Sequence, residues 1–371
     1  MIVSVSKKAR AFYWAVFDGF ETACANFISK YKESKYLKKY MTKEPIPTDF
    51  KKAYMKYWKP YKIVRGGGVK YAWYYASQNG IQDPRYIPNN LYYTKIDQYF
   101  NDRKLGWGFN DKNYYSKIFA GIPQPKTVVR KIKGLLFDED YRQITVDEAV
   151  ALLLSEPEVI CKPTLETGSG RGIRFWNTQT DAGEIRVFLM NPDETDYAVQ
   201  AILKQHAELN RVHEGSINTI RISSLLMDDG VHILSSVLRM GVGNAKVDNA
   251  TAGDNAQYDG MTCGINSNGR LKKYAYGYYT GKKFDRHPQG LVFDGYTVPC
   301  YDKAVELVKK VHPTIAHFRL VSWDVAIDEN ENAVLIEANM RNGSINFHQF
   351  NNGPLFGDLT ERVLKEVFVK N

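Results

Sequence analysis

The sequence predicts an α+β fold that is preceded by a mainly helical N-terminal region, and three observations support this. Near the start of the chain, Phe12, Ala15, Val16 and Phe20 recur at the three-to-four spacing of a helix. From about residue 110 onward, short apolar runs of strand length alternate with helical stretches. Towards the end of the chain, two apolar runs flank the polar tract 328–332, which is the pattern of a β-hairpin.

Length and composition indicate a globular chain with two or three substructures. At 371 residues the chain exceeds a single ordinary domain, and 44% of its residues are hydrophobic. Its longest apolar runs fall far short of the roughly 20 residues that a membrane span needs, and no signal-peptide pattern follows Met1. The four cysteines lack the spacing of a zinc site or a disulfide framework. These features predict a cytoplasmic protein.

The positive charge is concentrated in one part of the chain. The formal net charge is +9, and residues 1–60 hold 13 Lys or Arg against 5 Asp or Glu. Aromatic residues such as Trp14, Tyr54 and Trp58 are interleaved with them. This pattern is typical of a surface that binds nucleic acid, an anionic membrane or an acidic glycan. It is also typical of amphipathic helices with solvated lysines and buried aromatics, which is the interpretation that we favour.

The order of patterns divides the chain into three regions. We expect a basic, aromatic-rich helical region at 1–109, a first lobe at 110–198 and a second lobe at 199–371. Within the lobes, the patterns predict helices near 112–119, 146–155 and 358–369 and short strands at 127–129 and 134–137. No internal repeat or low-complexity segment is present.

The predicted hairpin gathers three oxygen ligands. Asp324 lies in its first apolar run, and Glu337 and Asn339 lie two residues apart in the second, so the latter two share a face. Antiparallel pairing brings Asp324 opposite them. Carboxylate and amide oxygens suit Mg²⁺, which proteins bind together with phosphate oxygens. The hairpin therefore predicts a magnesium–phosphate site, with acids at the rim of an ordinary hairpin as the alternative.

A glycine-rich segment supplies a second candidate phosphate contact. It follows an apolar run that ends at Lys162. The loop contains Gly168, Ser169, Gly170, Arg171 and Gly172. The backbone N–H groups of such a loop can approach phosphate oxygens, and the lysine adds a fixed charge. The segment lacks the end of a P-loop motif and is not followed by a helix, and a flexible surface hairpin is the alternative.

The motifs of residues 110–371 follow one another in an informative order. The chain presents Asp111-Lys112, Gly121-Ile122-Pro123, Lys162 with its glycine loop, an apolar strand, two arginines and the acidic hairpin. This order resembles the ATP-grasp superfamily, in which two α+β lobes hold Mg-ATP between them. The segments SINTIRI, VDNATAGD, SWDVAI and IEANM resemble its sugar-transfer-associated group. The resemblance implies an ATP-grasp fold after the basic helical region.

The resemblance also implies roles in binding ATP and Mg²⁺ for residues at matching positions. The nucleotide-binding lysines correspond to Lys112 and Lys162, and the mobile loop over the β- and γ-phosphates corresponds to 168–172. The segment that meets adenine corresponds to Gln200, Ala201 and Leu203, and a ribose-binding acid corresponds to Glu208. The metal ligands correspond to Asp324, Glu337 and Asn339, with Mn²⁺ as an alternative metal.

The chain departs from the family where the transferred phosphoryl group is steadied. Many members have an arginine two residues before the first metal ligand, and this chain has Ser322 there. Arg221, Arg239 and Arg341 are the candidates for the missing catalytic charge.

Two loops hold candidate residues on the substrate side. His287 is expected in a loop that faces the cleft, where it orients a carboxylate or acts on an amine. A structural or solvated histidine is the alternative. Asp248 and Asn249 are expected to line the acceptor pocket or to serve turn chemistry.

The activity that the resemblance implies is carboxylate–amine ligation. A carboxylate attacks the γ-phosphate of ATP, and an amine captures the acylphosphate to give an amide. The association of the group with surface-polysaccharide genes suggests that an amino acid or amine is joined to a uronic acid or to another glycan or peptide precursor. The alternatives are a kinase with a hydroxyl acceptor and a non-catalytic nucleotide-binding module anchored to a polyanionic surface.

The expected partners are therefore small molecules or glycan and peptide precursors, and no nucleic acid is expected. The basic N-terminal region is expected to make peripheral contact with an anionic membrane, at its inner face, or with polysaccharide machinery.

Overall fold

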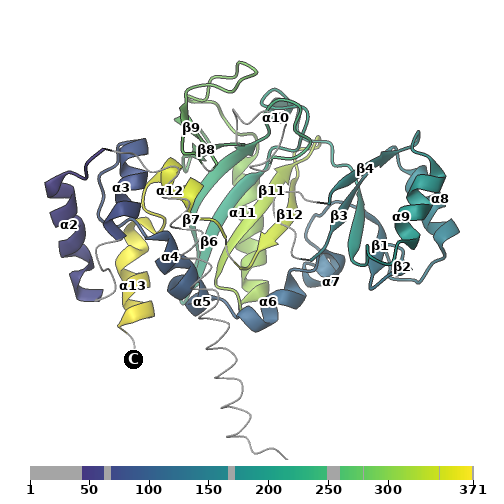
Figure 1. The fold of residues 1–371 in the computed structure, drawn as a ribbon, viewed down its shortest axis with the longest axis horizontal. Coiled ribbons are helices and arrows are strands. Elements are labelled where there is room, and N and C mark those ends of the chain that lie inside the picture. The colour runs from purple at the N-terminus through teal and green to yellow at the C-terminus, as the bar shows by residue number, and fades with distance from the viewer. Residues whose placement is uncertain are drawn as a thin grey trace, which may run out of the picture. The chain divides into compact units, whose positions relative to one another are not determined.

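The chain forms two compact units, one made of Met1–Tyr99 with Gly353–Asn371 and the other of Phe100–Asn352. The computed structural model describes residues 44–61, 68–165, 172–248, 260–278, 280–341 and 343–369 (Figure 1). The helix predicted around 12–20 and the loop residues 168–171 lie outside these ranges. Among the helices that are described, none is long and apolar enough to cross a membrane.

The first unit is helical around an aromatic core. It contains α2 (Thr48–Trp58), α3 (Gly68–Asn79), α4 (Asn89–Leu91) and α13 (Thr360–Phe368), and α5 (Asp97–Phe100) lies at its border. On α2, Phe50, Tyr54 and Trp58 recur every four residues and are buried. The ring centroids of Phe50 and Trp73 lie 5.4 Å apart. The indole N–H of Trp58 donates to the carbonyl oxygen of Pro84 at 2.8 Å.

The basic residues around α2 face solvent. Lys51, Lys52 and Lys56 are exposed on the helix, and Lys59 is exposed just after it. Over residues 44–61, therefore, the aromatic side chains form core and the lysines are solvated. The buried aromatic side chains agree with the interpretation favoured from the sequence, and the exposed lysines agree with both interpretations.

The second unit contains a five-stranded antiparallel sheet in the order β2-β1-β5-β3-β4. Its strands are β1 (Thr127–Ile132), β2 (Leu135–Phe137), β3 (Glu158–Pro163), β4 (Arg174–Asn177) and β5 (Tyr197–Ala201). α8 (Val146–Ser155) and α9 (Ala182–Met190) pack on each other and share one apolar core with the sheet. The predicted strands near 127 and 134 and the helix at 146–155 are confirmed.

A seven-stranded antiparallel sheet completes this unit, in the order β10-β9-β8-β7-β6-β11-β12. Its strands are β6 (Ile220–Met227), β7 (Gly230–Met240), β8 (Met261–Ile265), β9 (Leu271–Gly277), β10 (Lys283–Phe284), β11 (Leu320–Ile327) and β12 (Ala333–Asn339). α11 (Tyr301–Val311) packs on β6, β11 and β12, and α12 (Asn346–Asn352) packs on β7, β8 and β9. The shorter helices are α6 (Arg103–Phe109), α7 (Tyr115–Ile118) and α10 (Ala207–Asn210). Two sheets with attached helices confirm the α+β prediction.

β11 and β12 form the predicted hairpin because the Asp328 side chain holds the polar tract between them in a turn. The Asp328 side chain accepts hydrogen bonds from the backbone N–H groups of Asn330 at 2.9 Å and of Asn332 at 2.7 Å. Such a side-chain-to-backbone turn leaves the flanking apolar runs free to pair. All eight residues of β11 are buried, as expected for a strand with neighbours on both sides.

The free edge of β12 is covered by the segment that precedes β1. The backbone N–H of Leu335 donates to the carbonyl oxygen of Pro123 at 2.8 Å. The Tyr115 hydroxyl donates to the carbonyl oxygen of Ala338 at 3.2 Å and accepts from its N–H at 3.3 Å. These contacts satisfy backbone groups that an edge strand would otherwise leave unpaired. They also bring the Asp111-Lys112 motif close to the acidic hairpin.

Thr145→Ala is expected to lower the free energy of unfolding by about 1 kcal/mol, because it removes a helix cap. The Thr145 hydroxyl accepts from the N–H of Glu148 at 3.2 Å, and the Glu148 carboxylate accepts from the N–H of Thr145 at 2.7 Å. Urea unfolding measures the difference. Ser155→Ala, at the other end of α8, is the control and is expected to cost less than about 0.5 kcal/mol. Equal losses in the two variants would contradict the capping role.

Candidate functional site

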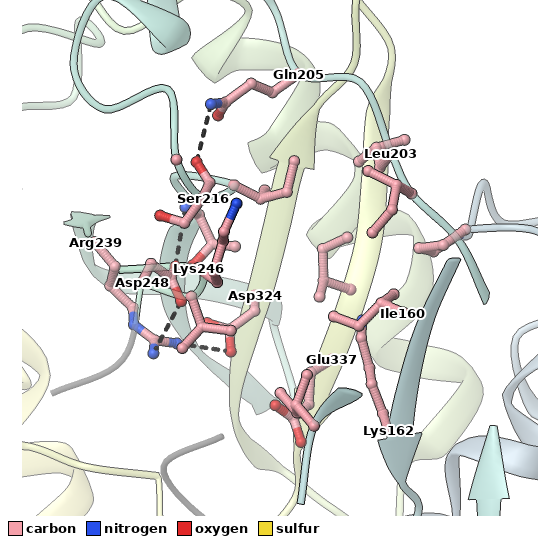
Figure 2. A pocket seen from close by; sticks show the side chains of 18 of the residues that line it. Ile160, Lys162, Leu203, Gln205, Ser216, Arg239, Lys246, Asp248, Asp324 and Glu337 are labelled. Atoms are coloured by element: carbon pink, nitrogen blue, oxygen red, sulfur yellow. Dashed lines mark hydrogen bonds and ion pairs between the residues drawn. The ribbon is translucent and has the colours of Figure 1, made fainter. Parts of the chain in front are cut away.

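A cavity of about 760 Å³ is lined by residues of both sheets of the second unit (Figure 2). This volume lies within the range of small-molecule sites in proteins. The five-stranded sheet and the segments next to it contribute Ile160, Lys162, Phe175, Ala201 and Leu203. The seven-stranded sheet contributes Arg221, Arg239, Asp324, Glu337 and Asn339. The side of the five-stranded sheet is thus mainly apolar, with Lys162 among its charged members, and the side of the seven-stranded sheet is mainly charged.

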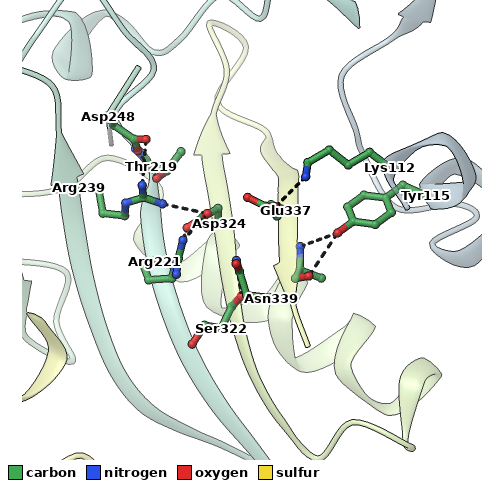
Figure 3. A network of polar contacts seen from close by, with 11 residues as sticks. Lys112, Tyr115, Thr219, Arg221, Arg239, Asp248, Ser322, Asp324, Glu337 and Asn339 are labelled. Carbon is green, nitrogen blue, oxygen red and sulfur yellow. Dashed lines mark hydrogen bonds and ion pairs between the residues drawn. The ribbon is translucent and has the colours of Figure 1, made fainter. Parts of the chain in front are cut away.

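The charged wall is a row of side chains across neighbouring strands (Figure 3). Arg221 on β6 is directly opposite Asp324 on β11, and Asp324 is directly opposite Glu337 on β12. Directly opposed residues of antiparallel strands project from the same face of the sheet. The pairing predicted between Asp324 and Glu337 is therefore confirmed, and the row continues to Arg221.

Asp324 is held by two guanidinium groups. Arg221 donates from Nε and Nη2 to the two carboxylate oxygens, with the Nη2 contact at 2.6 Å. Arg239 donates from Nη1 to Oδ2 at 2.9 Å. Burial alone would raise the pKa of Asp324, but the two arginines outweigh burial and hold this pKa below its ordinary value. Asp324 is therefore a buried carboxylate that stays charged.

Glu337 is paired with Lys112. Nζ of Lys112 lies 2.8 Å from Oε1 of Glu337. Burial alone would lower the pKa of Lys112, but the Glu337 carboxylate outweighs burial and raises it. In the same way, burial would raise the pKa of Glu337, and Lys112 lowers it. Both groups keep their charges at the inner end of the cavity.

Hydrogen bonds from Arg130 on β1 and from Tyr141 fix the turn that carries Lys112. The carbonyl oxygen of Asn113 accepts from Nη1 of Arg130 at 2.7 Å and from the Tyr141 hydroxyl at 2.7 Å. The Asp111 side chain accepts from the N–H of Asn113 at 2.9 Å and so caps the turn. Sequence reasoning missed Arg130 and Tyr141, because neither belongs to a recognisable motif.

A β-bulge in β12 adjusts the acidic wall. Asp324 pairs with Glu337, but the next residue, Val325, pairs with Leu335, so Ile336 is an extra residue. A bulge interrupts the strict alternation of side chains along a strand. As a result Ile336 and Glu337, neighbours in sequence, both line the cavity.

Lys162 lies on β3 and projects into the cavity as predicted (Figure 2). Its Nζ donates to the side-chain oxygen of Gln200 at 3.3 Å, so Gln200 supports the lysine. Burial, together with the nearby positive charge of Lys112, lowers the pKa of Lys162 to about 8. Of the glycine loop, Gly172 is described. It has a φ of 77°, and a Cβ there would lie 2.9 Å from Cγ of Pro163, so glycine is required.

The apolar wall lies where the nucleobase segment was expected. Ala201 and Leu203 line the cavity together with Ile160 and Ile336. Glu208, predicted to bind ribose, is not brought to the cavity, and this prediction is corrected. It lies in the first turn of α10, where its carboxylate pairs with Arg211 at 2.8 Å on the exposed side of the helix. The nearby residues that do line the cavity are Asn210 and Glu214.

His287 does not face the cavity, so the prediction of a substrate-side role is wrong. Its side chain is fully buried, and Nε2 lies 2.8 Å from the carbonyl oxygen of Gly241. The ring packs beside that of His213, whose Nε2 lies 3.0 Å from the carbonyl oxygen of Gly243. Burial lowers the pKa of His287, which favours the neutral ring. The two histidines instead hold the chain as it leaves β7.

Arg341 is also absent from the residues that line the cavity, which corrects its candidacy for the catalytic charge. Its aliphatic stem packs against α6, and a Cβ on Gly106 would collide with Cδ of Arg341. Its contact with this neighbouring helix accounts for its absence from the cavity lining. Arg221 and Arg239 remain as the arginines brought to the hairpin.

Asp248 lines the cavity and contacts the charged wall, as one of its two predicted roles requires. Nη2 of Arg239 lies 3.3 Å from Oδ1 of Asp248. Asn249 lies outside the described residues. Thr219, which donates to Asp248, was missed because a threonine at the start of a strand carries no functional signal in the sequence.

The donor set of the hairpin fits a magnesium ion. Asp324, Glu337 and Asn339 all line the cavity. The Asn339 amide N–H donates to the carbonyl oxygen of Ser322 at 3.1 Å, which leaves the amide oxygen as an acceptor. Two charged carboxylates and one amide oxygen are hard ligands of the kind that Mg²⁺ takes, with phosphate oxygens and water completing its shell.

The two α+β halves thus enclose a cavity with a charged side and a mainly apolar side. Residues 92–365 match the family described as sugar-transfer associated ATP-grasp. The chain belongs to this family. Both the family and the ATP-grasp fold predicted from the sequence are confirmed. No match was found among curated proteins.

Solved structures resemble the chain distantly. The ATP-grasp ligase PsnB, complexed with a minimal precursor, is 11% identical over 72% of this chain and 64% of that chain, with a TM-score of 0.41. D-alanyl-alanine synthetase A from Vibrio cholerae is 12% identical over 71% of this chain and 66% of that chain, with a TM-score of 0.39. D-cycloserine synthetase DcsG is 12% identical over 68% of this chain and 70% of that chain, with a TM-score of 0.39. The match spans less than two thirds of PsnB, and none of these likenesses identifies a substrate.

The Lys162 amine is expected to titrate near pH 8 in the folded protein, because burial and Lys112 disfavour its charge. Only the protonated lysine is positively charged, so its attraction for an anion in the cavity is present below that pH and is lost as the pH rises through it. NMR titration of ¹³C-methylated lysines measures the pKa, and Lys162→Met assigns the resonance. Titration at the ordinary lysine value, near about 10.4, would contradict the burial.

Proposed function

We propose that the chain is an ATP-dependent carboxylate–amine ligase that forms an amide through an acylphosphate. The observation that carries the proposal is the charged wall of the cavity. Two acids and an asparagine from one hairpin, two arginines and two lysines converge at one end of a space with an apolar opposite wall. Such a site suits a nucleotide whose base is apolar on both faces and whose phosphates need cations.

Each wall has a part in holding ATP under this proposal. Ala201, Leu203 and Ile336 contact the base, and Lys112 and Lys162 contact phosphate oxygens. The metal-binding residues are Asp324, Glu337 and Asn339. Bound Mg²⁺ supplies positive charge that neutralises the transferred phosphoryl group, and Mn²⁺ is a substitute with the same oxygen ligands.

The reaction requires positioning and charge more than a covalent nucleophile. A substrate carboxylate oxygen attacks the γ-phosphorus, the bond to ADP breaks, and an acylphosphate forms. The amine nitrogen then attacks the acyl carbon, phosphate leaves, and the amine proton passes to solvent. Arg221 and Arg239 lie beside Asp324, where they supply the positive charge that an arginine at the position of Ser322 supplies in related enzymes.

The family description supports an acceptor from sugar metabolism. We infer that the carboxylate belongs to a uronic acid or to another glycan or peptide precursor and that the amine is an amino acid or a simple amine. A cavity of about 760 Å³ that also holds a nucleotide leaves room for a small acceptor or for the end of a larger one.

Glu337→Gln is expected to reduce ADP formation by more than about 100-fold while the fold persists, because a metal ligand loses its charge with little change in shape. Circular dichroism and coupled-enzyme ADP release measure the two effects. Glu331→Gln, in the turn of the same hairpin, is the control and should retain activity, because Glu331 does not line the cavity. Turnover at the wild-type rate in Glu337→Gln would overturn the metal assignment.

A screen of carboxylates crossed with amines tests the reaction type. ADP release that depends on both substrates, with an amide found by mass spectrometry, supports the ligase. A stable phosphorylated hydroxyl acceptor would support a kinase instead. If ATP with Mg²⁺ did not raise the melting temperature, the nucleotide site itself would be wrong.

We also infer that the basic N-terminal region contacts an anionic partner. Lys51, Lys52, Lys56 and Lys59 are exposed and lie within a segment of net positive charge. Deleting residues 1–60 would test this poorly, because Phe50, Tyr54 and Trp58 belong to the aromatic core. Charge removal at the surface is the better probe.

Changing these four lysines to glutamine is expected to weaken binding to anionic vesicles at least about tenfold, since each lysine contributes about 1 kcal/mol near such a surface. ATP affinity should stay unchanged, because the four residues are outside the cavity lining. Vesicle sedimentation and calorimetry measure the two affinities. Unaltered vesicle binding would show that these lysines are solvated only.

A further inference from the structure

Asp248 is fixed next to the charged wall by contacts that do not depend on an arginine (Figure 3). Its Oδ2 accepts from the backbone N–H of Thr219 at 3.1 Å and from the Thr219 hydroxyl. Thr219 is itself tied to β7, because the N–H of Arg239 donates to its carbonyl oxygen at 2.8 Å. The remaining oxygen, Oδ1, is directed to Nη2 of Arg239. Asp248 therefore presents one carboxylate oxygen to Arg239 while Thr219 holds the other.

Arg239 is shared between two carboxylates. Its Nη1 lies 2.9 Å from Oδ2 of Asp324, and its Nη2 lies 3.3 Å from Oδ1 of Asp248. Arg221, in contrast, has Asp324 as its one carboxylate partner among the residues that the structure describes. The two guanidinium groups also repel each other. One carboxylate between two buried cations is poorly balanced, and Asp248 supplies the second negative charge.

We propose that Asp248 is a positioning residue that keeps Arg239 in the cavity, so that Arg239 contacts the terminal phosphate oxygens of the bound nucleotide. The inference rests on the proposed function. When the oxygens of Asp324 turn to a metal ion, Arg239 retains Asp248 as its carboxylate partner. Nη1 is then available to an anion, while the guanidinium keeps its orientation. A buried arginine without such an anchor would be left with an uncompensated charge.

A structural role for Asp248 is the competing explanation. On that view, Asp248 only ties the segment after β7 to the sheet through Thr219, and its loss would weaken every ligand of the cavity alike. The positioning role instead predicts an effect confined to the terminal phosphate. Comparing the non-hydrolysable ATP analogue AMPPNP with ADP, each with Mg²⁺, isolates that phosphate.

Asp248→Asn tests the proposal. The amide oxygen can still accept from Thr219, but the amide NH₂ offers no charge to Arg239. The variant is expected to lose about tenfold in affinity for Mg-AMPPNP and less than about threefold for Mg-ADP, as measured by calorimetry. Asp285→Asn is the matched control, because Asp285 is exposed and pairs with Arg286 outside the cavity. Its two affinities should equal those of the wild type.

Arg239→Lys provides an independent test that does not alter Asp248. Lysine keeps the positive charge but cannot bridge two carboxylates, so the same selective loss of Mg-AMPPNP is expected. Combining the two substitutions should add little to either one, because both remove the same contact. Additive losses would mean that the two residues act separately and would overturn the proposal.

The possible failures are distinguishable. Equal losses for AMPPNP and ADP in a folded Asp248→Asn variant would overturn the positioning role and leave the nucleotide site intact. Unchanged affinity for both ligands would do the same. If the wild-type protein bound neither nucleotide with Mg²⁺, the proposed function would fail, and this inference with it.

Discussion

Lys112 and Glu337 come from different halves of the second unit, and their 2.8 Å ion pair joins those halves at the charged end of the cavity. Lys112 belongs to a turn anchored on β1 by Arg130, whereas Glu337 belongs to β12 of the other sheet. A charge buried away from water is tolerated only beside a counter-charge. The ion pair and the contacts of Tyr115 and Pro123 with β12 therefore hold this end of the cavity together, and the pair of Arg221 with Asp324 adds opposed charges across the sheet.

Because the charged wall consists of ion pairs, a bound ligand can replace the pairs within the protein by pairs between the protein and the ligand. Under the proposed function, a divalent cation takes the oxygens of Asp324 and Glu337, while phosphate oxygens take the lysines and arginines that those acids release. Breaking a buried pair by removing one partner costs about 3–5 kcal/mol, because the other charge is left uncompensated. A ligand that brings both signs together avoids this cost. A metal ion alone pairs only with the acids of the charged wall, and phosphate alone pairs only with its lysines and arginines. The site therefore favours a metal–nucleotide complex over either part.

The local parts of this site could be predicted from the sequence, and the long-range parts could not. Periodicity and turn residues were sufficient for α8 and for the hairpin, because these depend on neighbours in the chain. The failures share a cause. Whether His287 faces a cavity or Gly241, and whether Arg341 reaches Asp324 or packs on Gly106, depends on contacts between distant segments. The ribose-binding prediction for Glu208 failed for a different reason, since a shift of a few residues along a helix turns a side chain to another face.

β12, which carries Glu337 and Asn339, lies at the edge of its sheet. An edge strand exposes backbone groups that must be covered, and the segment from Asp111 to Pro123 covers β12 through Tyr115 and Pro123. The segment that protects the edge is also the one that delivers Lys112 to Glu337. A central strand, paired on both sides, would leave no place for a segment of the other half to dock. The bulge at Ile336 completes the arrangement, because it turns two successive residues of this edge strand towards the cavity, one apolar and one charged. The segment 111–123 therefore covers the edge of β12, places Lys112 beside Glu337 and supports the strand residues that line the cavity. A change that loosens this segment should disturb all three features together.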